Sequence, residues 1–521
     1  MILILDFGSQ YSQLIARKVR SFSVYCQILP FDTSVAEIRG LAPDGIILSG
    51  GPASVREKGS PKIDRRLLTL PRAESQAAGF PTVPILGLCY GMQLLVHLLG
   101  GEVKPQSHSE YGRAMLRHNS SDPLLRGVPK RDTVWMSHND AAVRLPSEWR
   151  ALAGTGGCSQ AVARHRKLPL YGLQFHPEVH HTSHGGQILR NFVFNVCGAS
   201  ADWKMADYIE QTVTETRARL DAARGARIVC AVSGGVDSTV LAVLMHRAAS
   251  GRCLPIFVDN GVLRANEAQI VMRNFHDRLG FDVKMINAGS RFLRALRGIT
   301  DPEQKRRIIG REFVNIFFRK LRPNDFLAQG TLYPDVIESV NVRGPSATIK
   351  THHNRVPEIL ALMKQNRVIE PLRELFKDEV RQLGLQLGIP RDVLWRQPFP
   401  GPGLAVRILG EITKGRLDIL RLADAIVIEE IRAAGLYEKL WQSFAVLLPV
   451  KAVGVMGDSR TYSNVVAVRA VESVDAMTAD FARLPWDVLA RIASRIINEA
   501  PGVNRVVYDV SSKPPSTIEW E

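Results

Sequence analysis

The sequence predicts an α/β protein of three domains, two with open and mostly parallel sheets and a third, smaller domain of α+β type. At 521 residues the chain is too long for a single hydrophobic core, so several domains are expected. Short apolar runs alternate with helical runs over residues 1–195 and again from residue 227, as in parallel sheets covered by helices. A run rich in proline and glycine, residues 396–403, then interrupts regular structure. We therefore predict domains at residues 1–198, 199–396 and 397–521.

The expected helices and strands follow in chain order. In the first domain we expect buried strands at residues 2–5, 45–48, 83–86 and 170–175, and a linker at 197–201. The second domain opens with a polar helix over 203–223 and continues with strands at 227–232, 254–258 and 283–286. The third domain should contain helices at 416–433 and 486–499 and strands at 451–455 and 465–470.

The charge balance limits the classes of partner. A formal net charge of +16 favours anionic partners such as nucleotides, although an arginine-rich surface also serves solubility. A nucleic-acid partner is not expected, because no stretch interleaves Lys and Arg with aromatic residues in a binding module. A membrane partner is not expected either, since no apolar stretch is long enough to span a bilayer.

Cysteine usage and the N-terminus indicate a cytoplasmic protein. The chain has six cysteines without a CxxC pair, which fits a reducing compartment. The apolar run at residues 1–5 stops at Asp6 and has no basic leader, so it is interpreted as a strand and not as a signal peptide.

Cys89 lies where an activated nucleophile is expected. Flanking glycines in Gly87-Leu88-Cys89-Tyr90-Gly91 allow a tight turn between an apolar strand and a helical run, which leaves the sulfur accessible at a helix N-terminus. We predict His176 as its base and Glu178 as the residue that orients the imidazole. Backbone N–H groups near Gly51 and at Tyr90 are the candidate oxyanion hole.

The remaining cysteines and a histidine cluster are given structural interpretations. Single buried cysteines are usually packing residues, which is the prediction for Cys26, Cys158, Cys197, Cys230 and Cys253. The cluster His180, His181 and His184 lacks a set of Cys or Asp partners for a metal, so we predict surface histidines.

A second reaction centre is predicted at a phosphate loop. Small residues between a buried strand and a helix expose several backbone N–H groups to an anion, and the ATP-binding residues are expected to be Ser233, Gly234, Gly235, Val236, Asp237, Ser238 and Thr239. Asp237 would repel phosphate unless it held a cation, so Mg²⁺ is the expected cofactor.

The type of phosphate chemistry follows from a missing motif. No Gly-Lys-Ser/Thr occurs in the sequence, which argues against γ-phosphate transfer and favours cleavage between the α- and β-phosphates. The segment 258–261 ends the next strand, where an open sheet holds its ligand. Asp335 and Glu338 in the polar loop 329–339 are either further site carboxylates or partners of surface arginines.

These motifs resemble the glutamine-hydrolysing GMP synthase family over essentially the whole chain. Residues 6–11, 87–93 and 174–178 are similar to its class I glutaminase, and residues 233–238 to its ATP-pyrophosphatase loop. The segments 329–339, 397–403 and 513–521 separate it from amidotransferases that share only the cysteine domain.

The resemblance implies domain roles and a reaction. The three domains would be a class I glutamine amidotransferase, an adenine nucleotide α-hydrolase-like ATP-pyrophosphatase, and a domain for dimerisation and XMP binding. The substrates would be glutamine, ATP and XMP: Cys89 would release ammonia, and the second domain would adenylate XMP for conversion to GMP. The XMP-binding residues implied are Arg311, Gln442, Lys513, Ile518 and Glu519, and the implied assembly is a homodimer.

Two segments depart from the family pattern. Asn139 stands where the family usually has glycine, so we expect a positive φ there, which Asn tolerates best after Gly. Residues 355–358 (Arg-Val-Pro-Glu) replace the usual Gly-Gly-Leu-Pro, which predicts a lid of different shape.

Two other functions stay open at this point. Another ATP-pyrophosphatase, of the NAD synthetase or tRNA-thiolating type, shares the phosphate loop, although thiolation needs paired catalytic cysteines and Cys230 and Cys253 lie within predicted strands. A regulatory or nucleic-acid-binding protein would explain the positive charge, and it predicts salt-sensitive binding to DNA or RNA.

Overall fold

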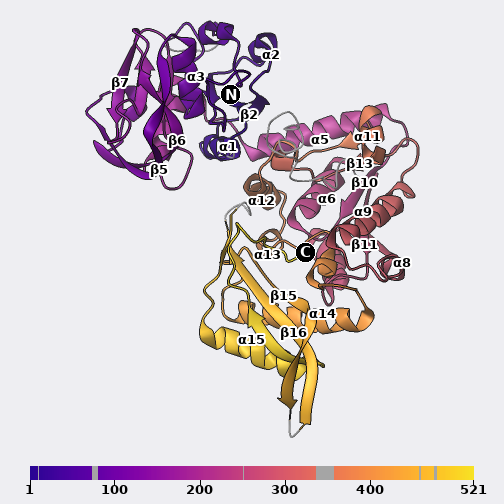
Figure 1. Cartoon of the computed structure of the whole chain (residues 1–521). Coiled ribbons are helices and arrows are strands. Elements are labelled where there is room, and N and C mark those ends of the chain that lie inside the picture. Colours follow the sequence, from indigo (N-terminus) through magenta and orange to yellow (C-terminus); the bar gives the residue numbers. More distant parts are fainter. Residues whose placement is uncertain (10, 73–79, 250, 336–356, 457–458, 474–477) are drawn as a thin grey trace. The chain divides into compact units, whose positions relative to one another are not determined.

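The computed structural model describes residues 1–9, 11–72, 80–249, 251–335, 357–456, 459–473 and 478–521 (Figure 1). These residues form two compact units, the first comprising residues 1–204 and the second the described residues from Met205 onwards. None of the described helices is both long and apolar enough to cross a membrane.

The first unit contains a nine-stranded sheet in the order β2-β1-β3-β4-β9-β8-β7-β5-β6. Its parallel half consists of β1 (Ile2–Asp6), β2 (Cys26–Pro30), β3 (Gly45–Leu48), β4 (Ile85–Leu88) and β9 (Leu170–Leu173). Antiparallel strands complete it: β5 (Glu102–His118), β6 (Arg131–Arg144), β7 (Trp149–Gly154) and β8 (Val162–His165). The helices are α1 (Ser12–Arg20), α2 (Val35–Gly40), α3 (Tyr90–Leu98) and α4 (Gly185–Arg190).

The four strands predicted for this unit are confirmed, with small shifts at their ends. Every residue of β1, β3, β4 and β9 is buried, because a parallel sheet is covered on both faces. The prediction missed β2 and the antiparallel half. The long strands β5 and β6 mix polar and apolar residues, so they do not form the continuous apolar run by which buried strands were sought.

The second unit contains a parallel five-stranded sheet in the order β12-β11-β10-β13-β14. Its strands are β10 (Ile228–Val232), β11 (Cys253–Asp259), β12 (Lys284–Asn287), β13 (Phe326–Ala328) and β14 (Val368–Ile369). Its helices are α5 (Met205–Ala222), α6 (Val236–Ala249), α7 (Glu267–Arg273), α8 (Gly289–Ala295), α9 (Pro302–Phe318), α11 (Pro357–Lys364), α12 (Lys377–Gln386) and α13 (Arg391–Leu394). The prediction found β10, β11 and β12. It missed β13 and β14, because strands of three and two residues are too short to show a hydrophobic periodicity.

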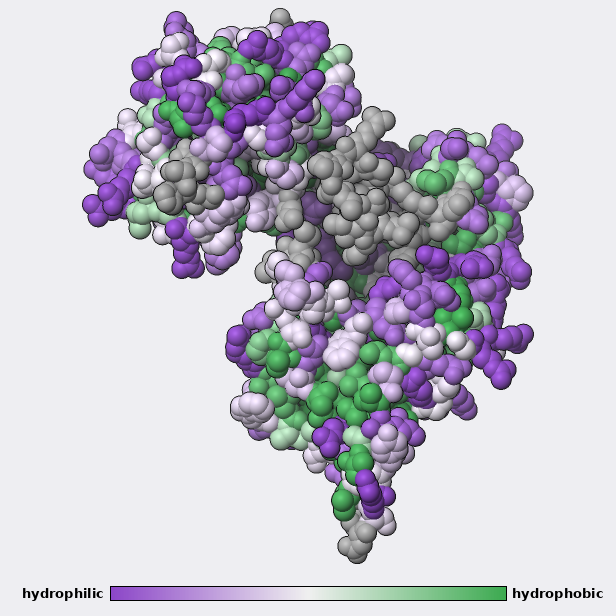
Figure 2. All heavy atoms as spheres, viewed as in Figure 1, coloured by the Kyte–Doolittle hydropathy of each residue, from purple (hydrophilic) through white to green (hydrophobic). Residues whose placement is uncertain are grey.

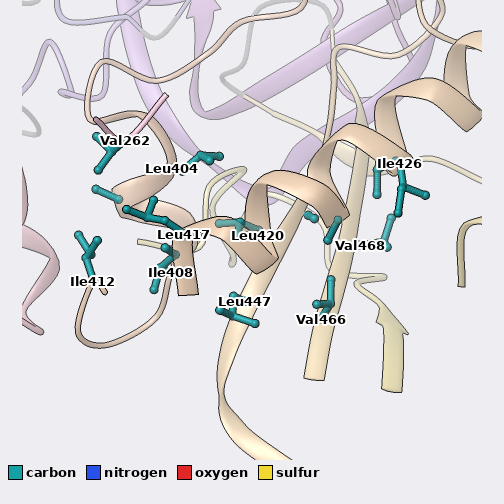
Figure 3. Close-up of a cluster of buried hydrophobic side chains, with 14 of the residues drawn as sticks. Val262, Leu404, Ile408, Ile412, Leu417, Leu420, Ile426, Leu447, Val466 and Val468 are labelled. Atoms are coloured by element: carbon teal, nitrogen blue, oxygen red, sulfur yellow. The ribbon is translucent and has the colours of Figure 1, made fainter. Parts of the chain in front are cut away.

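A four-stranded sheet lies in the C-terminal part of the second unit. Its strands are β15 (Gln442–Met456), β16 (Ser459–Glu472), β17 (Asp480–Phe481) and β18 (Val503–Tyr508), and its helices are α14 (Lys414–Ala433) and α15 (Trp486–Glu499). Figure 3 shows side chains of α14 packed towards this sheet, with Leu420 and Ile426 facing Leu447 and Val468. The predicted helices and strands are confirmed, although β15 and β16 extend well beyond the predicted ranges.

The boundary predicted between residues 396 and 397 lies inside this second unit. One buried cluster includes Val229 and Val258 of the five-stranded sheet together with Leu420 and Val466 of the C-terminal part. The two sheets therefore share a core, and the division into a second and a third domain stays a prediction.

Candidate active site

Cys89 lies at a sharp turn between β4 and α3. Its backbone has φ 49° and ψ −104°, a conformation that costs a non-glycine residue energy and is typical of a residue held for function. A Cβ on Gly87 would lie 2.5 Å from the backbone of Gly91, and one on Gly91 would lie 2.5 Å from the carbonyl of Leu48. The flanking glycines therefore allow the close approach that the turn requires. The predicted turn is confirmed, whereas the expected exposure of the sulfur is not, because Cys89 is buried with 7% of its surface exposed.

His176 is brought to Cys89 by strand pairing. β4 and β9 are parallel neighbours with Leu88 opposite Leu173, so residues that follow the two strands emerge at the same edge of the sheet. His176 Nδ1 lies 2.8 Å from Glu178 Oε1, and the Cys89 thiol is near enough to the imidazole to contribute to the raised pKa of His176. The three predicted residues are thus in contact in the order required for an activated thiol.

The electrostatics of this triad favour a charged imidazole. Burial alone disfavours the imidazolium, but the negative charge of Glu178 and the hydrogen bonds with Cys89 and Glu178 outweigh it and raise the pKa of His176 well above its ordinary value. Thr182 Oγ1 donates to the His176 carbonyl at 2.7 Å, and the ring of Tyr11 packs edge-on against the imidazole, which holds the ring in place.

A cavity of about 560 Å³ opens above the thiol. Its lining includes Gly51, Cys89 and Tyr90, together with Tyr111 and residues 137–140 of β6. Tyr90 is the first residue of α3, so its N–H has no intrahelical acceptor. Gly51 cannot carry a side chain, because a Cβ there would lie 2.8 Å from the Phe7 carbonyl. Both candidate oxyanion donors therefore border the same cavity as the sulfur, and their catalytic role stays a prediction.

The expectation for Asn139 was wrong. This residue lies inside β6, between the paired positions His138 and Asp140, and it is not among the residues with a positive φ. A strand residue needs no left-handed backbone, so asparagine replaces glycine there without strain. Its Oδ1 accepts a hydrogen bond of 2.9 Å from the Tyr111 hydroxyl, which ties β6 to β5 at the cavity wall.

The raised pKa of His176 predicts a pH-dependent effect of Glu178→Gln. Loss of the carboxylate lowers the pKa of His176, so at pH 7 fewer molecules carry the imidazolium that stabilises the Cys89 thiolate. Iodoacetamide should therefore alkylate Cys89 more slowly in Glu178→Gln than in the unsubstituted chain at pH 7. The difference should shrink at alkaline pH, where the imidazolium is lost in both proteins.

A matched control is Glu57→Gln, which removes an exposed carboxylate from the wall of the same cavity. It should leave the alkylation profile unchanged. Equal alkylation of Glu178→Gln and the unsubstituted chain across pH 6 to 9 would show that Glu178 does not activate the thiol.

The other cysteines behave as structural residues. Four of the five are buried and Cys253 is half-buried, and none of them forms a disulfide in the described part of the chain. Burial raises the pKa of the Cys158 thiol to about 11. The sulfur atoms of Cys230 and Cys253 lie 3.8 Å apart on β10 and β11, and their hydrogen bond together with burial raises the pKa of Cys230, which disfavours a reactive thiolate at Cys230.

The three histidines do not form a metal site. His180 and His181 are exposed, and His184 Nδ1 lies 2.8 Å from Asp132 Oδ1. In the part of the chain that the structure describes, no group of three His, Cys, Asp or Glu side chains is arranged to hold a metal ion.

The phosphate loop lies between β10 and α6 and is open to solvent at Ser233. Ser233 Oγ and Ser238 Oγ lie 2.9 Å apart, and Ser238 Oγ also accepts from the Ser233 N–H at 3.1 Å, so the hydroxyls fold the loop back on itself.

The glycines of the loop allow its tight turn. Gly234 has φ +77°, and a Cβ there would lie 2.4 Å from Val271. Thr239 Oγ1 donates to the Gly235 carbonyl at 2.8 Å. This geometry confirms the predicted turn and leaves the first N–H groups of α6 to an anion.

Asp237 fits a role in binding a cation. Its Oδ1 is buried and has no hydrogen-bond partner among the described residues, while Oδ2 lies 3.5 Å from Lys377 Nζ on α12. A carboxylate oxygen is a ligand that Mg²⁺ prefers, and Mg²⁺ commonly takes one or two carboxylates together with substrate phosphates. Lys377 was missed from the sequence because no motif marks it; only the packing of α12 on α6 brings it to the loop.

The segment that follows β11 borders this centre. Asp259 Oδ1 accepts from the Gly261 N–H at 2.9 Å, and Asn260 is buried with an Nδ2 that has no hydrogen-bond partner within the described ranges. Gly403 of the Pro- and Gly-rich segment packs on this loop, because a Cβ there would lie 2.4 Å from the Val262 carbonyl. This segment therefore braces the carboxyl end of β11.

The loop carboxylates and the altered lid are only partly described. Asp335 Oδ2 accepts from the Leu332 N–H at 2.9 Å, which caps a turn, while Glu338 lies outside the described residues. Arg355 and Val356 also lie outside them, and Glu358 lies in the first turn of α11.

The five residues predicted to bind XMP differ in burial and in contacts with one another. Gln442 Nε2 donates to Glu519 Oε1 at 2.7 Å, so these two are in direct contact. Ile518 is buried against the C-terminal sheet, and Lys513 pairs through its backbone with Ala479. Arg311 is exposed on α9. Arg407, which sequence reasoning missed, forms two hydrogen bonds with Glu519 from a fully buried position.

Comparison with known proteins gives consistent matches. Residues 3–196 match the family model described as glutamine amidotransferase class-I, and residues 429–520 match the GMP synthase C terminal domain. The chain is 52% identical over 525 residues to the GMP synthase [glutamine-hydrolyzing] of Aquifex aeolicus and 51% identical to that of Caldanaerobacter subterraneus, covering 100% of this chain and 99% of each relative. A putative GMP synthase component from Thermoplasma acidophilum, of known crystal structure, is 30% identical over 38% of this chain and 93% of its own, with a TM-score of 0.31.

Relatives of half-identical sequence thus match this chain from end to end, through both reaction centres and the C-terminal segment. The chain belongs to the family of glutamine-hydrolysing GMP synthases.

Proposed function

We propose that this chain hydrolyses glutamine to ammonia at Cys89 and uses ATP at its phosphate loop to aminate XMP, giving GMP, AMP and pyrophosphate. The observation that carries the proposal is the contact of Cys89, His176 and Glu178 beside a cavity, in a chain that also exposes an anion-binding loop.

The glutaminase steps follow from the triad geometry. The Cys89 thiolate attacks the amide carbon of glutamine, and the N–H groups of Gly51 and Tyr90 stabilise the oxyanion. The His176 imidazolium gives its proton to the departing nitrogen, so ammonia leaves and a thioester remains. His176 then takes a proton from water, which attacks the thioester and releases glutamate. Glu178 stabilises the charged imidazole in both steps.

The synthetase steps use the phosphate loop. The C2 oxygen of XMP attacks the α-phosphorus of ATP, and pyrophosphate leaves while held by the loop N–H groups and by Lys377. The adenylyl group makes the C2 oxygen a good leaving group. Ammonia then attacks C2, AMP departs with the oxygen and one proton is released, which gives GMP. The lack of a Walker lysine agrees with cleavage at the α-phosphorus.

We propose Mg²⁺ as the cofactor of this second centre. The Oδ1 of Asp237, which has no hydrogen-bond partner among the described residues, would hold the ion next to the phosphates of ATP. When bound there, Mg²⁺ neutralises the charge that develops on the departing pyrophosphate. Lys377 supplies a second positive charge on the other oxygen of the same carboxylate.

We propose that the long strands β15 and β16 form part of a homodimer interface. Val450, Val453, Val455 and Tyr462 are exposed, with Val455 at 77% and Tyr462 at 67%. Figure 2 shows apolar atoms gathered over this part of the second unit. Val453 lies opposite Tyr462 in the pairing of the two strands, and exposed apolar side chains that lie together are typical of protein–protein contacts. Light scattering after size exclusion should give twice the mass of the chain, and Val455→Glu should shift it towards the monomer.

The compartment and the other partners are proposed as well. None of the six cysteines forms a disulfide in the part of the chain that the structure describes, which suits a reducing compartment, and we propose the cytoplasm. The positive charge serves anionic substrates, so DNA or RNA is not a proposed partner.

The deciding experiment is product analysis with XMP, ATP and glutamine. We expect GMP, AMP and pyrophosphate in equal amounts. Formation of ADP and phosphate would overturn α-phosphorus cleavage, and GMP from ammonium but not from glutamine would overturn the role of the Cys89 centre.

Lys513→Ala tests the proposed XMP subsite. Loss of its positive charge should raise the XMP KM about tenfold, a typical effect of removing a charged hydrogen-bond partner, and should change the ATP KM little. The measurement is the XMP titration with ammonium as nitrogen source. An unchanged titration would remove Lys513 from the site.

A further inference from the structure

Three cations in the second unit have no exposed surface. Among the described lysines and arginines, Lys305, Arg407 and Arg469 are each 0% exposed. Moving a charged side chain out of water costs free energy unless nearby partners compensate for it. The partners of these three buried cations therefore have to be identified. All three contact the C-terminal tail, defined here as residues 511–521.

Arg407 holds the carboxylate of Glu519. Its Nε donates to Oε2 at 3.0 Å and its Nη2 to Oε1 at 2.8 Å, a two-pronged pairing that fixes the carboxylate in orientation. The guanidinium lies 3.9 Å from the ring centre of Phe444, and Gln442 donates a third hydrogen bond to Oε1. Both carboxylate oxygens of Glu519 are thereby occupied, and its backbone carbonyl accepts a hydrogen bond from the Thr517 hydroxyl.

Arg469 holds the middle of the tail. It donates to the Ser511 carbonyl at 2.6 Å and to the Thr517 carbonyl at 3.2 Å, and so bridges two distant points of this loop. The same guanidinium lies 3.4 Å from Asp509 Oδ2, which accepts from the indole N–H of Trp520 at 2.9 Å. One buried arginine thus connects three points of the segment.

Lys305 holds the end of the tail. Its ammonium donates to the Ile408 carbonyl at 2.7 Å and forms an ion pair with the Glu521 carboxylate. The other carboxylate oxygen, Oε1, accepts from the Gly410 N–H at 3.3 Å. Helix α9, which carries Lys305, is in this way joined to the last residue of the tail.

The tail has little regular structure of its own. It contains neither a helix nor a strand, apart from a single bridge between Lys513 and Ala479. A segment with few backbone hydrogen bonds must obtain much of its order from side chains. Its carboxylates would also repel an anionic ligand, and the buried cations neutralise them.

We propose that Lys305, Arg407 and Arg469 are positioning residues that lock the tail in one conformation, so that Lys513 and the tail backbone meet the phosphate of XMP. The inference rests on the proposed function for the identity of the ligand. The lock neutralises Asp509, Glu519 and Glu521, whose carboxylates would otherwise repel the phosphate.

The test separates the lock from overall stability. Lys305→Met leaves the Glu521 carboxylate without its cation, so with ammonium as nitrogen source we expect the XMP KM to rise at least about tenfold while kcat and the ATP KM stay within about twofold. In Lys305→Met/Glu521→Leu the uncompensated charge is removed, and most of the loss in XMP KM should be recovered. Arg407→Lys, which keeps the charge but loses the two-pronged pairing, should also raise the XMP KM.

A second measurement does not depend on XMP. Glutamyl endopeptidase cleavage after Glu519, followed by intact mass, should be slow in the unsubstituted chain and faster in Lys305→Met and Arg407→Lys. The control Arg483→Met removes an arginine that is 74% exposed and lies 3.5 Å from Asp480. It should alter neither readout.

Each outcome decides one part of the proposal. Cleavage at equal rates in all variants would show that Lys305 and Arg407 do not hold the tail in one conformation. Faster cleavage with an unchanged XMP KM would overturn its role in XMP binding. If the unsubstituted chain made no GMP at all, the proposed function would fail, while the protease measurement would still test the lock.

Discussion

Cys89→Ala should abolish GMP synthesis from glutamine and leave synthesis from ammonium within about twofold of the unsubstituted chain. The alanine side chain cannot form the thioester, and removal of a catalytic nucleophile typically costs a factor of about 10⁴ or more. Ammonium bypasses this step, because it supplies the nitrogen directly to the adenylated XMP. The measurement is GMP formation with each nitrogen source at saturating ATP and XMP.

A buried cysteine of the same unit provides the matched control. Cys158 is buried and burial raises the pKa of its thiol to about 11, so Cys158→Ala should retain synthesis from both nitrogen sources. Equal loss of both activities in Cys89→Ala would contradict the division of labour between the two centres. Retention of glutamine-dependent synthesis would show that another group is the nucleophile.

Asp237→Asn should abolish synthesis with either nitrogen source. The amide keeps the shape of the side chain but removes the negative charge of a carboxylate whose Oδ1 has no hydrogen-bond partner in the described part of the chain. Loss of such an electrostatic contact to a transferring phosphoryl group is expected to cost about 10²-fold or more in kcat. Alkylation of Cys89 should stay normal, because the first unit is unchanged. The measurement is ammonium-dependent GMP formation across a Mg²⁺ titration.

The Mg²⁺ titration distinguishes two roles of Asp237. If the carboxylate binds the ion, the variant should need more Mg²⁺ for its residual activity; if it only orients Lys377, the Mg²⁺ requirement should stay the same. Asp221→Asn is the control, since Asp221 is exposed on α5 and pairs with Arg252. Full ammonium-dependent activity in Asp237→Asn would remove the residue from the centre.

The two reaction centres could be located from the sequence because their signals are local. The elbow around Cys89 and the loop from Ser233 to Ser238 are each a few residues long, and glycine conformations and helix starts act over such distances. His176 and Glu178 could be paired for the same reason, being two residues apart. The contact between Cys89 and His176 required the further assumption that β4 and β9 are neighbours, which the sheet order confirms.

Other features could not be predicted in this way. β5 and β6 pair over most of their length, but each strand alone shows a pattern that is half polar. Asn139 was expected in a left-handed turn because the strand that contains it was not recognised. Lys377 lies far along the chain from Asp237, and nothing in its neighbours marks it.

By itself, the sequence determined the α/β class, the nucleophile with its elbow, the His–Glu pair and the phosphate loop. Only the tertiary structure decided which distant charges are buried together, as with Arg407 on Glu519, Arg469 on the tail carbonyls and Lys305 on Glu521. The physical reason is the distance along the chain over which each effect acts. Backbone preferences are set within a few residues, whereas the burial of a charge depends on every element packed around it.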